Sequence, residues 1–144
     1  MTIDPVSGKS SSRTPGNRRF GSYFCRIDHK NRFSMPVAIR HNLPGTELVL
    51  VPSLNRFTNK KVLRVFSLTE WEKMIDNLRP EERDIYIAHS QLAELDKIGR
   101  LRIPNDVMQR LEFRPSSELA VIQDTNHIRV MPKSDFQSIP LPTL

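Results

Sequence analysis

Runs of apolar residues mark the strands of this chain. Four of them are short, rich in β-branched residues and expected to be buried: ELVLV at 47–51, VLRVF at 62–66, ELAVI at 118–122 and HIRVM at 127–131. A further strand is predicted at 23–27, and segments 33–35 and 101–103 carry apolar residues at alternate positions. The pattern predicts a mainly β fold, in which the link at 52–61 is longer than the turn at 123–126.

Short helices are predicted directly after the two alternating segments. Pro36 and Pro104 suit the first position of a helix, where the missing N–H has no partner to lose. These helices would end near Leu43 and Leu111. The side chains expected to face the core are Val37 and Leu43 in the first helix, and Val107, Met108 and Leu111 in the second.

Other helices are predicted after the buried strands. Thr69 with Glu72, and Ser134 with Gln137, each fit the spacing of a capping box. An apolar stripe at helical spacing follows the first box, at Trp71, Met74, Ile75 and Leu78, whereas the second helix would stop near 139–140. Another helix is expected over 80–91.

The first half of the chain recurs in the second half. Residues 27–36, IDHKNRFSMP, align with residues 95–104, LDKIGRLRIP, at an offset of 68, and later blocks repeat in the same order. Several blocks in one order indicate a duplication, because chance rarely copies more than one short motif. We therefore divide the chain into a disordered basic tail at 1–19, a first unit at 20–79, a linking helix at 80–91, a second unit at 92–138 and a C-terminal stub at 139–144.

Each copy of the repeat carries Asp-x-x-x-Arg across a tight turn. Asn31 and Gly99 stand where such a turn needs a positive φ, which these two residue types tolerate. In a hairpin the Asp and the Arg would lie on adjacent strands, so that Asp28 and Asp96 could accept backbone N–H groups and pair with arginine. We assign the two aspartates, Asn31 and Gly99 to shaping the turns. Arg32 and Arg100 are assigned to contacting phosphate or guanine.

The net charge of +6 suggests an anionic partner, but much of it lies at the N-terminus. Residues 1–26 hold five basic side chains and one acidic side chain, whereas the remaining 118 residues hold 17 basic and 15 acidic ones. A Ser/Gly/Pro-rich basic tail can bind polyphosphate without specificity, yet solvated tails of this kind are common. Charge alone therefore leaves nucleic-acid binding open.

The sequence lacks the features of membrane, secreted and catalytic proteins. No apolar run approaches the roughly 18 residues of a membrane span, and residues 1–20 have no apolar signal core. The single cysteine, Cys25, favours a reducing cytoplasm and provides no zinc site. Cys25 and His29 are too far apart on an extended segment to act as nucleophile and base. We expect no enzymatic activity, cofactor, metal, membrane contact or small-molecule substrate.

The repeated motif resembles that of the MraZ family of bacterial transcriptional regulators, which contain two tandem SpoVT-AbrB-type units. The likeness covers about residues 20–138 and includes Gly21 and Tyr23 before the first motif and Trp71 after it. The chain departs from the family at Asn31, where a glycine is usual, at 88–91, and in a longer loop near 55–61.

The resemblance implies an α+β, mainly β fold, in which two swapped-hairpin units form a pseudo-dimer within one chain, with short flanking helices. It also implies a ring of identical chains that binds repeated sites on double-stranded DNA, upstream of division and cell-wall genes. Such a protein would be cytoplasmic and associated with the nucleoid. The alternatives are a structural or protein-interaction ring and an antitoxin-like partner, both without specific DNA binding.

Carried over by position, the DNA contacts of the family fall on Lys30 and Arg32 in the first unit and on Lys97 and Arg100 in the second. His29 and Arg102 lie beside them and are added as candidates, although a plain solvated role explains either residue. Arg40 and Arg110 are also near the motif and open to the same explanation. The aromatic and aliphatic positions expected in the core, and not as base-stacking platforms, are Phe33, Trp71, Leu101 and Phe136.

Overall fold

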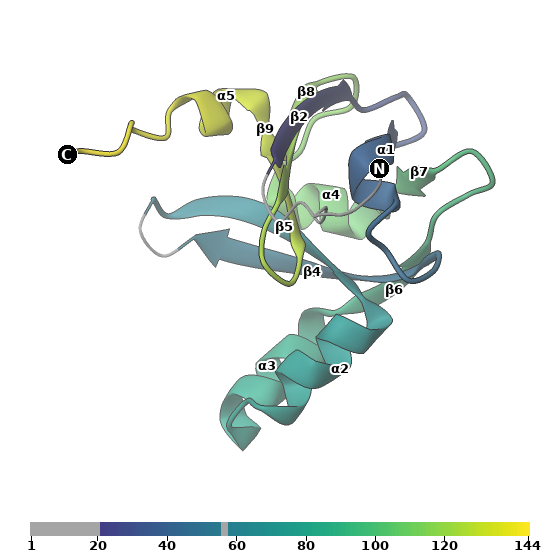
Figure 1. Cartoon of the computed structure of the whole chain (residues 1–144), viewed down its shortest axis with the longest axis vertical. Coiled ribbons are helices and arrows are strands. Elements are labelled where there is room, and N and C mark those ends of the chain that lie inside the picture. The colour runs from purple at the N-terminus through teal and green to yellow at the C-terminus, as the bar shows by residue number, and fades with distance from the viewer. Residues whose placement is uncertain (1–20, 56–57) are drawn as a thin grey trace, which may run out of the picture.

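The computed structural model describes residues 21–55 and 58–144, so the tail predicted at 1–19 lies outside the described residues. The strands are β2 (Gly21–Arg26), β3 (Arg32–Ser34), β4 (Glu47–Asn55), β5 (Lys60–Ser67), β6 (Gln91–Glu94), β7 (Arg100–Arg102), β8 (Glu118–Gln123) and β9 (Ile128–Pro132). The helices are α1 (Val37–Arg40), α2 (Leu68–Asp76), α3 (Pro80–His89), α4 (Asn105–Leu111) and α5 (Lys133–Gln137). The architecture is α+β and mainly β, as the apolar pattern predicts (Figure 1).

The strands form two antiparallel sheets. Six of them lie in the order β2-β8-β9-β5-β4-β6, and β3 and β7 form a separate two-stranded ribbon. Four of the strand pairs join the two halves of the chain: β2 with β8, β6 with β4, β5 with β9, and β3 with β7. The two halves therefore share one hydrogen-bonded framework.

The register of these pairs follows the sequence repeat. Phe33 lies opposite Leu101 in the ribbon. The repeat, at its offset of 68 residues, also aligns Phe33 with Leu101. Arg64 lies opposite Arg129 between β5 and β9, and these two are also counterparts in the repeat. A residue that faces its own copy marks a local pseudo-twofold axis, since exchanging the two halves leaves the pair unchanged.

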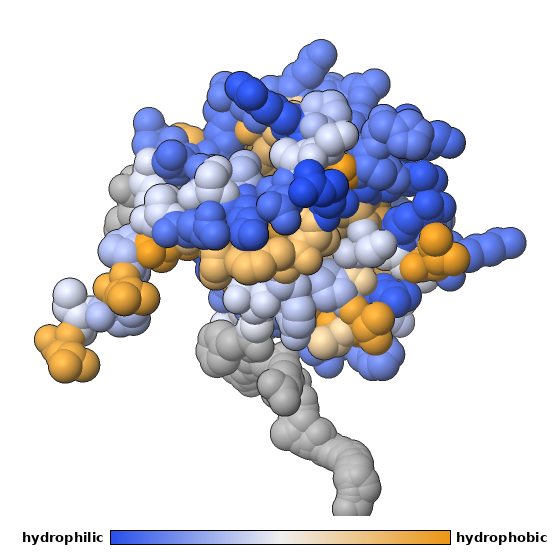
Figure 2. Space-filling model, turned by 90° about the horizontal axis from the view of Figure 1, so that it is seen from above, coloured by the Kyte–Doolittle hydropathy of each residue, from blue (hydrophilic) through white to orange (hydrophobic). Residues whose placement is uncertain are grey.

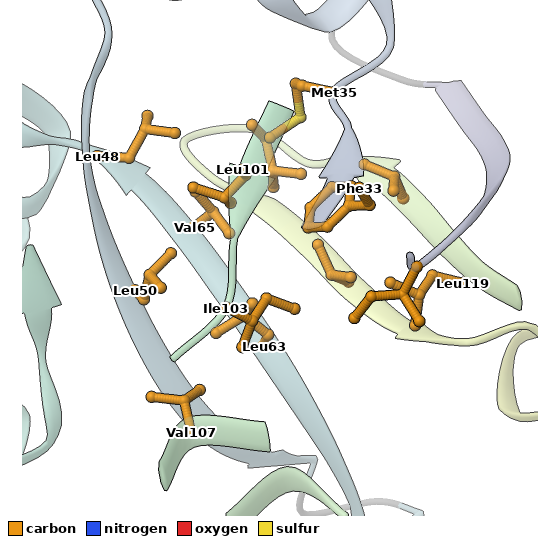
Figure 3. Close-up of a cluster of buried hydrophobic side chains, with 14 of the residues drawn as sticks. Phe33, Met35, Leu48, Leu50, Leu63, Val65, Leu101, Ile103, Val107 and Leu119 are labelled. Carbon is orange, nitrogen blue, oxygen red and sulfur yellow. The ribbon is translucent and has the colours of Figure 1, made fainter. Parts of the chain in front are cut away.

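The largest buried cluster lies between the six-stranded sheet and the ribbon (Figure 3). Phe33 and Leu101 reach it from the ribbon, and Leu50, Leu63 and Val65 reach it from the sheet. Each fully buried side chain of this size contributes about 1.5–3 kcal/mol relative to an exposed one. The cluster thus ties the ribbon firmly to the sheet.

Helices cover the opposite face of the sheet. Along β4, Val49 and Val51 point away from the main core and pack with Phe66 against Trp71 and Met74 of α2. On the second half, the sheet packs against Phe136 of α5. The α2–α3 pair extends away from the sheet (Figure 1), and no residue of α3 is buried. In the described part of the chain, no helix is long and apolar enough to cross a lipid bilayer.

The hairpin predicted within each half is wrong. The strands on either side of the first turn, β2 and β3, pair with β8 and β7 and not with each other. The Asp28 N–H still donates to the Arg32 carbonyl at 2.8 Å, which closes the turn. Beyond it the strands separate because Ile27, Phe33 and Met35 are all buried in the core beneath the sheet, which draws β3 out of the plane of β2.

Both predicted capping boxes are also wrong. The side chain of Ser67 accepts the N–H of Glu70 and caps α2, so the helix begins before Thr69. Ser134 lies inside α5, whose N-cap is Pro132. The S-x-x-E spacing also fits Ser67 with Glu70, so spacing alone did not choose between two overlapping boxes.

Two smaller expectations need correction. Val37 is 54% exposed, and Ile39 takes the buried position in α1. One turn of helix is too short for a periodic pattern to fix which side faces inward. The link at 52–61 is shorter than predicted, because β4 continues to Asn55 and β5 begins at Lys60. Four positions were expected in the core and not as base-stacking platforms. Of these, Phe33 and Leu101 are fully buried, and Trp71 and Phe136 are partly buried.

Candidate nucleic-acid interface

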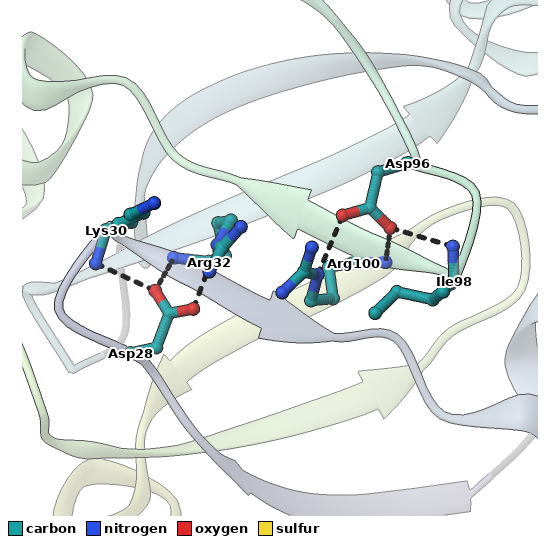
Figure 4. Close-up of polar contacts among 6 residues, drawn as sticks. All are labelled: Asp28, Lys30, Arg32, Asp96, Ile98 and Arg100. Atoms are coloured by element: carbon teal, nitrogen blue, oxygen red, sulfur yellow. Dashed lines mark hydrogen bonds and ion pairs between the residues drawn. The ribbon is translucent and has the colours of Figure 1, made fainter.

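The first Asp-x-x-x-Arg turn is organised by one carboxylate. Asp28 Oδ1 accepts the backbone N–H groups of Lys30 and Arg32, both at 2.9 Å. The other oxygen, Oδ2, accepts from Arg32 Nε at 2.9 Å (Figure 4). Asn31, between them, has a φ of 62°, the left-handed conformation that asparagine adopts more readily than most residues. The chain therefore reverses direction within four residues and fixes one edge of the guanidinium.

The second turn repeats this arrangement. Asp96 Oδ1 accepts the N–H groups of Ile98 at 3.1 Å and Arg100 at 2.8 Å, and Oδ2 accepts from Arg100 Nε at 2.7 Å. Gly99 stands at the left-handed position with a φ of 83°. Figure 4 shows the two turns at opposite ends of the ribbon, with both guanidinium groups between them.

Both aspartates are held in the charged form. The Arg32 N–H is the main cause that lowers the pKa of Asp28 to about 2, and the Lys30 N–H and the Arg32 guanidinium add to it. The Arg100 N–H is likewise the main cause that lowers the pKa of Asp96. Desolvation opposes the shift in both cases. Because the ion pairs are partly open to water, the backbone hydrogen bonds contribute most to the shape of the turns.

The ribbon places the arginines on a common surface. Arg32 lies opposite Arg102, and Ser34 lies opposite Arg100. Alternate residues of a strand point to opposite faces, so these four side chains share the outer face while Phe33 and Leu101 point into the core. Each motif guanidinium is bonded only to its own aspartate among the described residues, which leaves its terminal NH₂ groups available.

The remaining predicted contacts surround this surface. Lys30 and His29 are exposed at the tip of the first turn, Lys97 is exposed at the tip of the second, and Arg102 is exposed on the ribbon. The turns flank the ribbon because Ile103 N–H donates to the Asn31 carbonyl, and Met35 N–H donates to the Gly99 carbonyl. All six predicted DNA-binding residues thus lie on the ribbon or on its two turns.

Arg40 is a structural contributor to this site that was not included among the predicted site residues. Its guanidinium lies against Gly99, where a Cβ atom would be 2.3 Å from Arg40 Nη1. In the first turn, the corresponding support comes from Asn31 Nδ2, which donates to Asn105 Oδ1 at 2.6 Å. Each turn is therefore buttressed by the helix that follows the other strand of the ribbon. A helix in the other half leaves no signal in the local sequence.

Comparison with known proteins finds relatives that share one name. No family model matches it, but three curated relatives are informative, each named transcriptional regulator MraZ. The chain is 28% identical over 127 residues to the protein from Mesomycoplasma hyopneumoniae, covering 82% of each chain. It is 28% identical over 128 residues to that from Dehalococcoides mccartyi, covering 83% of this chain and 85% of the relative. It is 32% identical over 96 residues to that from Alkaliphilus metalliredigens, covering 60% and 63%. These matches support an MraZ-family assignment for the chain.

In the part of the chain that the structure describes, many basic residues away from the ribbon pair with carboxylates. An open groove of about 730 Å³ beside α5 is lined by several lysines and carboxylates. Lys61 bonds Glu112 at 2.6 Å, and Lys60 lies 3.5 Å from Asp135. Figure 2 shows a face dominated by hydrophilic side chains, from which the C-terminal segment projects. The groove therefore has mixed charge, and the ribbon is the better candidate for an anionic partner.

Proposed function

We propose that this chain is a transcriptional regulator that binds double-stranded DNA through the outer face of the β3–β7 ribbon and its two turns. The observation that carries the proposal is the register of the ribbon, which places Arg32, Arg100 and Arg102 on one surface. The names of the curated relatives agree with this function.

The geometry suits the major groove of DNA. The groove is wide enough for a two-stranded ribbon, and arginine is the commonest reader of guanine because it donates to O6 and N7 together. Asp28 and Asp96 hold the Nε edges of their arginines, so the terminal amino groups of Arg32 and Arg100 are oriented before DNA arrives. Lys30, Lys97 and His29 would contact the flanking phosphates.

The proposal includes the organisation of the chain. We infer two swapped-hairpin AbrB-like units, 20–79 and 92–138, joined by the helix at 80–91, that act as a pseudo-dimer. The interleaved strand pairs and the pseudo-twofold register support it. We further propose that the chain forms a ring whose copies bind repeated promoter sites, as the family resemblance implies for division and cell-wall genes. On this proposal it acts in the cytoplasm, at the nucleoid.

An equilibrium binding titration tests the DNA-binding surface. A sequence enriched by the wild-type protein from a random DNA library is compared with its scrambled version by fluorescence anisotropy at several salt concentrations. We expect specific binding that weakens steeply with salt. Arg102→Ala should lower the affinity about 5- to 150-fold, since one bidentate base contact is worth about 1–3 kcal/mol. Failure to enrich any sequence would favour a ring or antitoxin-like partner without specific DNA binding.

The choice of variants separates binding from folding. Among the described residues Arg102 has no carboxylate partner, so its removal leaves both turns intact, whereas Arg32→Ala and Arg100→Ala also remove a turn contact. Arg79, which lies between α2 and α3 and pairs with Glu82 at 3.3 Å, provides a control with the same change of charge. Equal effects of Arg79→Ala and Arg102→Ala would contradict the site assignment. Deleting residues 1–19 measures the separate contribution of the tail.

A further inference from the structure

The two turns present different side chains from the same backbone position. Lys30 in the first turn and Ile98 in the second are counterparts at the offset of 68 residues. In each turn the backbone N–H of this residue donates to the aspartate Oδ1, at 2.9 Å for Lys30 and 3.1 Å for Ile98. Both side chains therefore leave the chain from matching geometry, but one is cationic and the other is aliphatic.

Ile98 is an unusual residue for this position. Its side chain is 64% exposed, so it contributes little to the core. Tight turns favour polar residues and glycine, and a β-branched side chain has no conformational advantage there. Its neighbours in sequence are Lys97 and Gly99, and the nearby Asp96 is occupied by the turn. An exposed aliphatic group in basic surroundings fits a partner that combines negative charge with isolated apolar groups.

Double-stranded DNA has this combination. Its major groove displays phosphates along the edges and the C5-methyl group of each thymine on the floor, and apolar side chains read that methyl. Ile98 lies at the end of the ribbon, beside Gly99, whose carbonyl accepts the N–H of Met35, the residue directly after β3. It is also two residues from Arg100, whose guanidinium lies on the outer face. A ribbon in the groove would bring both side chains to neighbouring base pairs.

We propose that Ile98 is a specificity-determining residue that contacts the methyl group of a thymine next to the base pair read by Arg100. This inference rests on the proposed DNA-binding function. The contact would make the two halves of the pseudo-symmetric interface unequal. The first turn has Lys30 where the second has Ile98, and Ser34 is the counterpart of Arg102. The two ends of the ribbon would therefore prefer different bases.

Replacing thymine by deoxyuridine removes only the methyl group and tests the contact directly. In a DNA sequence enriched by the wild-type protein, each thymine is replaced singly, and the affinities of wild type and Ile98→Ala are compared. We expect a position in the repeated site where deoxyuridine weakens the wild type about fourfold, the value of one buried methyl at about 0.8 kcal/mol. Ile98→Ala should lose most of that difference while retaining its affinity for the deoxyuridine DNA.

Two further variants serve as controls. Lys30→Ala should weaken binding and reduce the salt dependence by about one phosphate contact, yet leave the methyl preference unchanged. Ile98→Lys, which makes the second turn resemble the first, should remove the methyl preference and increase the salt dependence. Because Ile98 is exposed, thermal unfolding of its variants should match that of the wild type.

The outcomes distinguish the inference from the function on which it rests. An enriched sequence whose methyl dependence is the same in wild type and Ile98→Ala would overturn the inference and leave DNA binding standing. An enriched site without thymine would do the same. A lower oligomer mass for Ile98→Ala would show instead that this side chain contacts a second copy of the chain. If no sequence is enriched at all, the proposed function fails and the inference fails with it.

Discussion

Replacing Phe33 with alanine should destabilise both halves of the chain together. Phe33 is 1% exposed, lies on the pseudo-twofold axis opposite Leu101, and belongs to the core cluster that joins the ribbon to the sheet. Truncating a buried phenylalanine to alanine costs about 3–5 kcal/mol, from lost burial and from the cavity left behind. For a chain of this length the same change lowers Tm on the order of 10–20 °C.

Urea unfolding followed by circular dichroism measures this loss. The matched control is Phe24→Ala, the same substitution at a side chain that is 50% exposed. Phe24 contacts the Phe136 ring edge-on, with centroids 5.6 Å apart, and Lys133 lies 4.7 Å from its centroid. Because these contacts are at the surface, the control should lose only about 1 kcal/mol.

The number and steepness of the unfolding transitions test whether the two halves share one core. The interleaved strands predict a single cooperative transition for the wild type and for Phe33→Ala, with an unchanged dependence on urea. Two separate transitions, or a loss no larger than that of Phe24→Ala, would refute the reasoning that one core supports both halves.

Further predictions concern a turn and two partly buried groups. Gly99→Ala should cost about 1–2 kcal/mol for the positive φ alone and also displace Arg40, whereas Asn31→Gly should cost about 1 kcal/mol or less; urea midpoints compare the two. Burial is the main cause that lowers the pKa of His127 from 6.5 to about 4, with the charge of Arg64 adding to it. The unfolded chain therefore binds a proton that the folded chain does not. Stability should be full above pH 6.5 and fall by up to about 3 kcal/mol towards pH 4, a slope that His127→Gln should lack. Burial raises the pKa of the Cys25 thiol to about 11, so alkylation at pH 8 should be roughly 100-fold slower than in the urea-unfolded chain; equal rates would contradict this environment.

Much of the local structure was predictable from sequence because its causes are local. The buried strands follow from runs such as ELVLV, whose apolar residues serve both faces of a covered sheet. The turns follow from Asp28 and Asp96 placed before Asn31 and Gly99, since a short carboxylate and a residue tolerant of positive φ act within four residues. The duplication itself was visible in the order of matching blocks.

The tertiary structure decided which strands pair and which side chains meet. Backbone hydrogen bonds are the same for every residue, so a strand does not encode its partner, and β2 joins β8 although β3 is nearer in sequence. The local pattern could not show that Arg102 lies opposite Arg32, or that Arg40 packs on Gly99, because these contacts cross between the halves. The choice between Val37 and Ile39 also depended on the core above α1. Sequence alone thus determined turns and apolar faces, while burial of one shared core determined the surface on which the arginines gather.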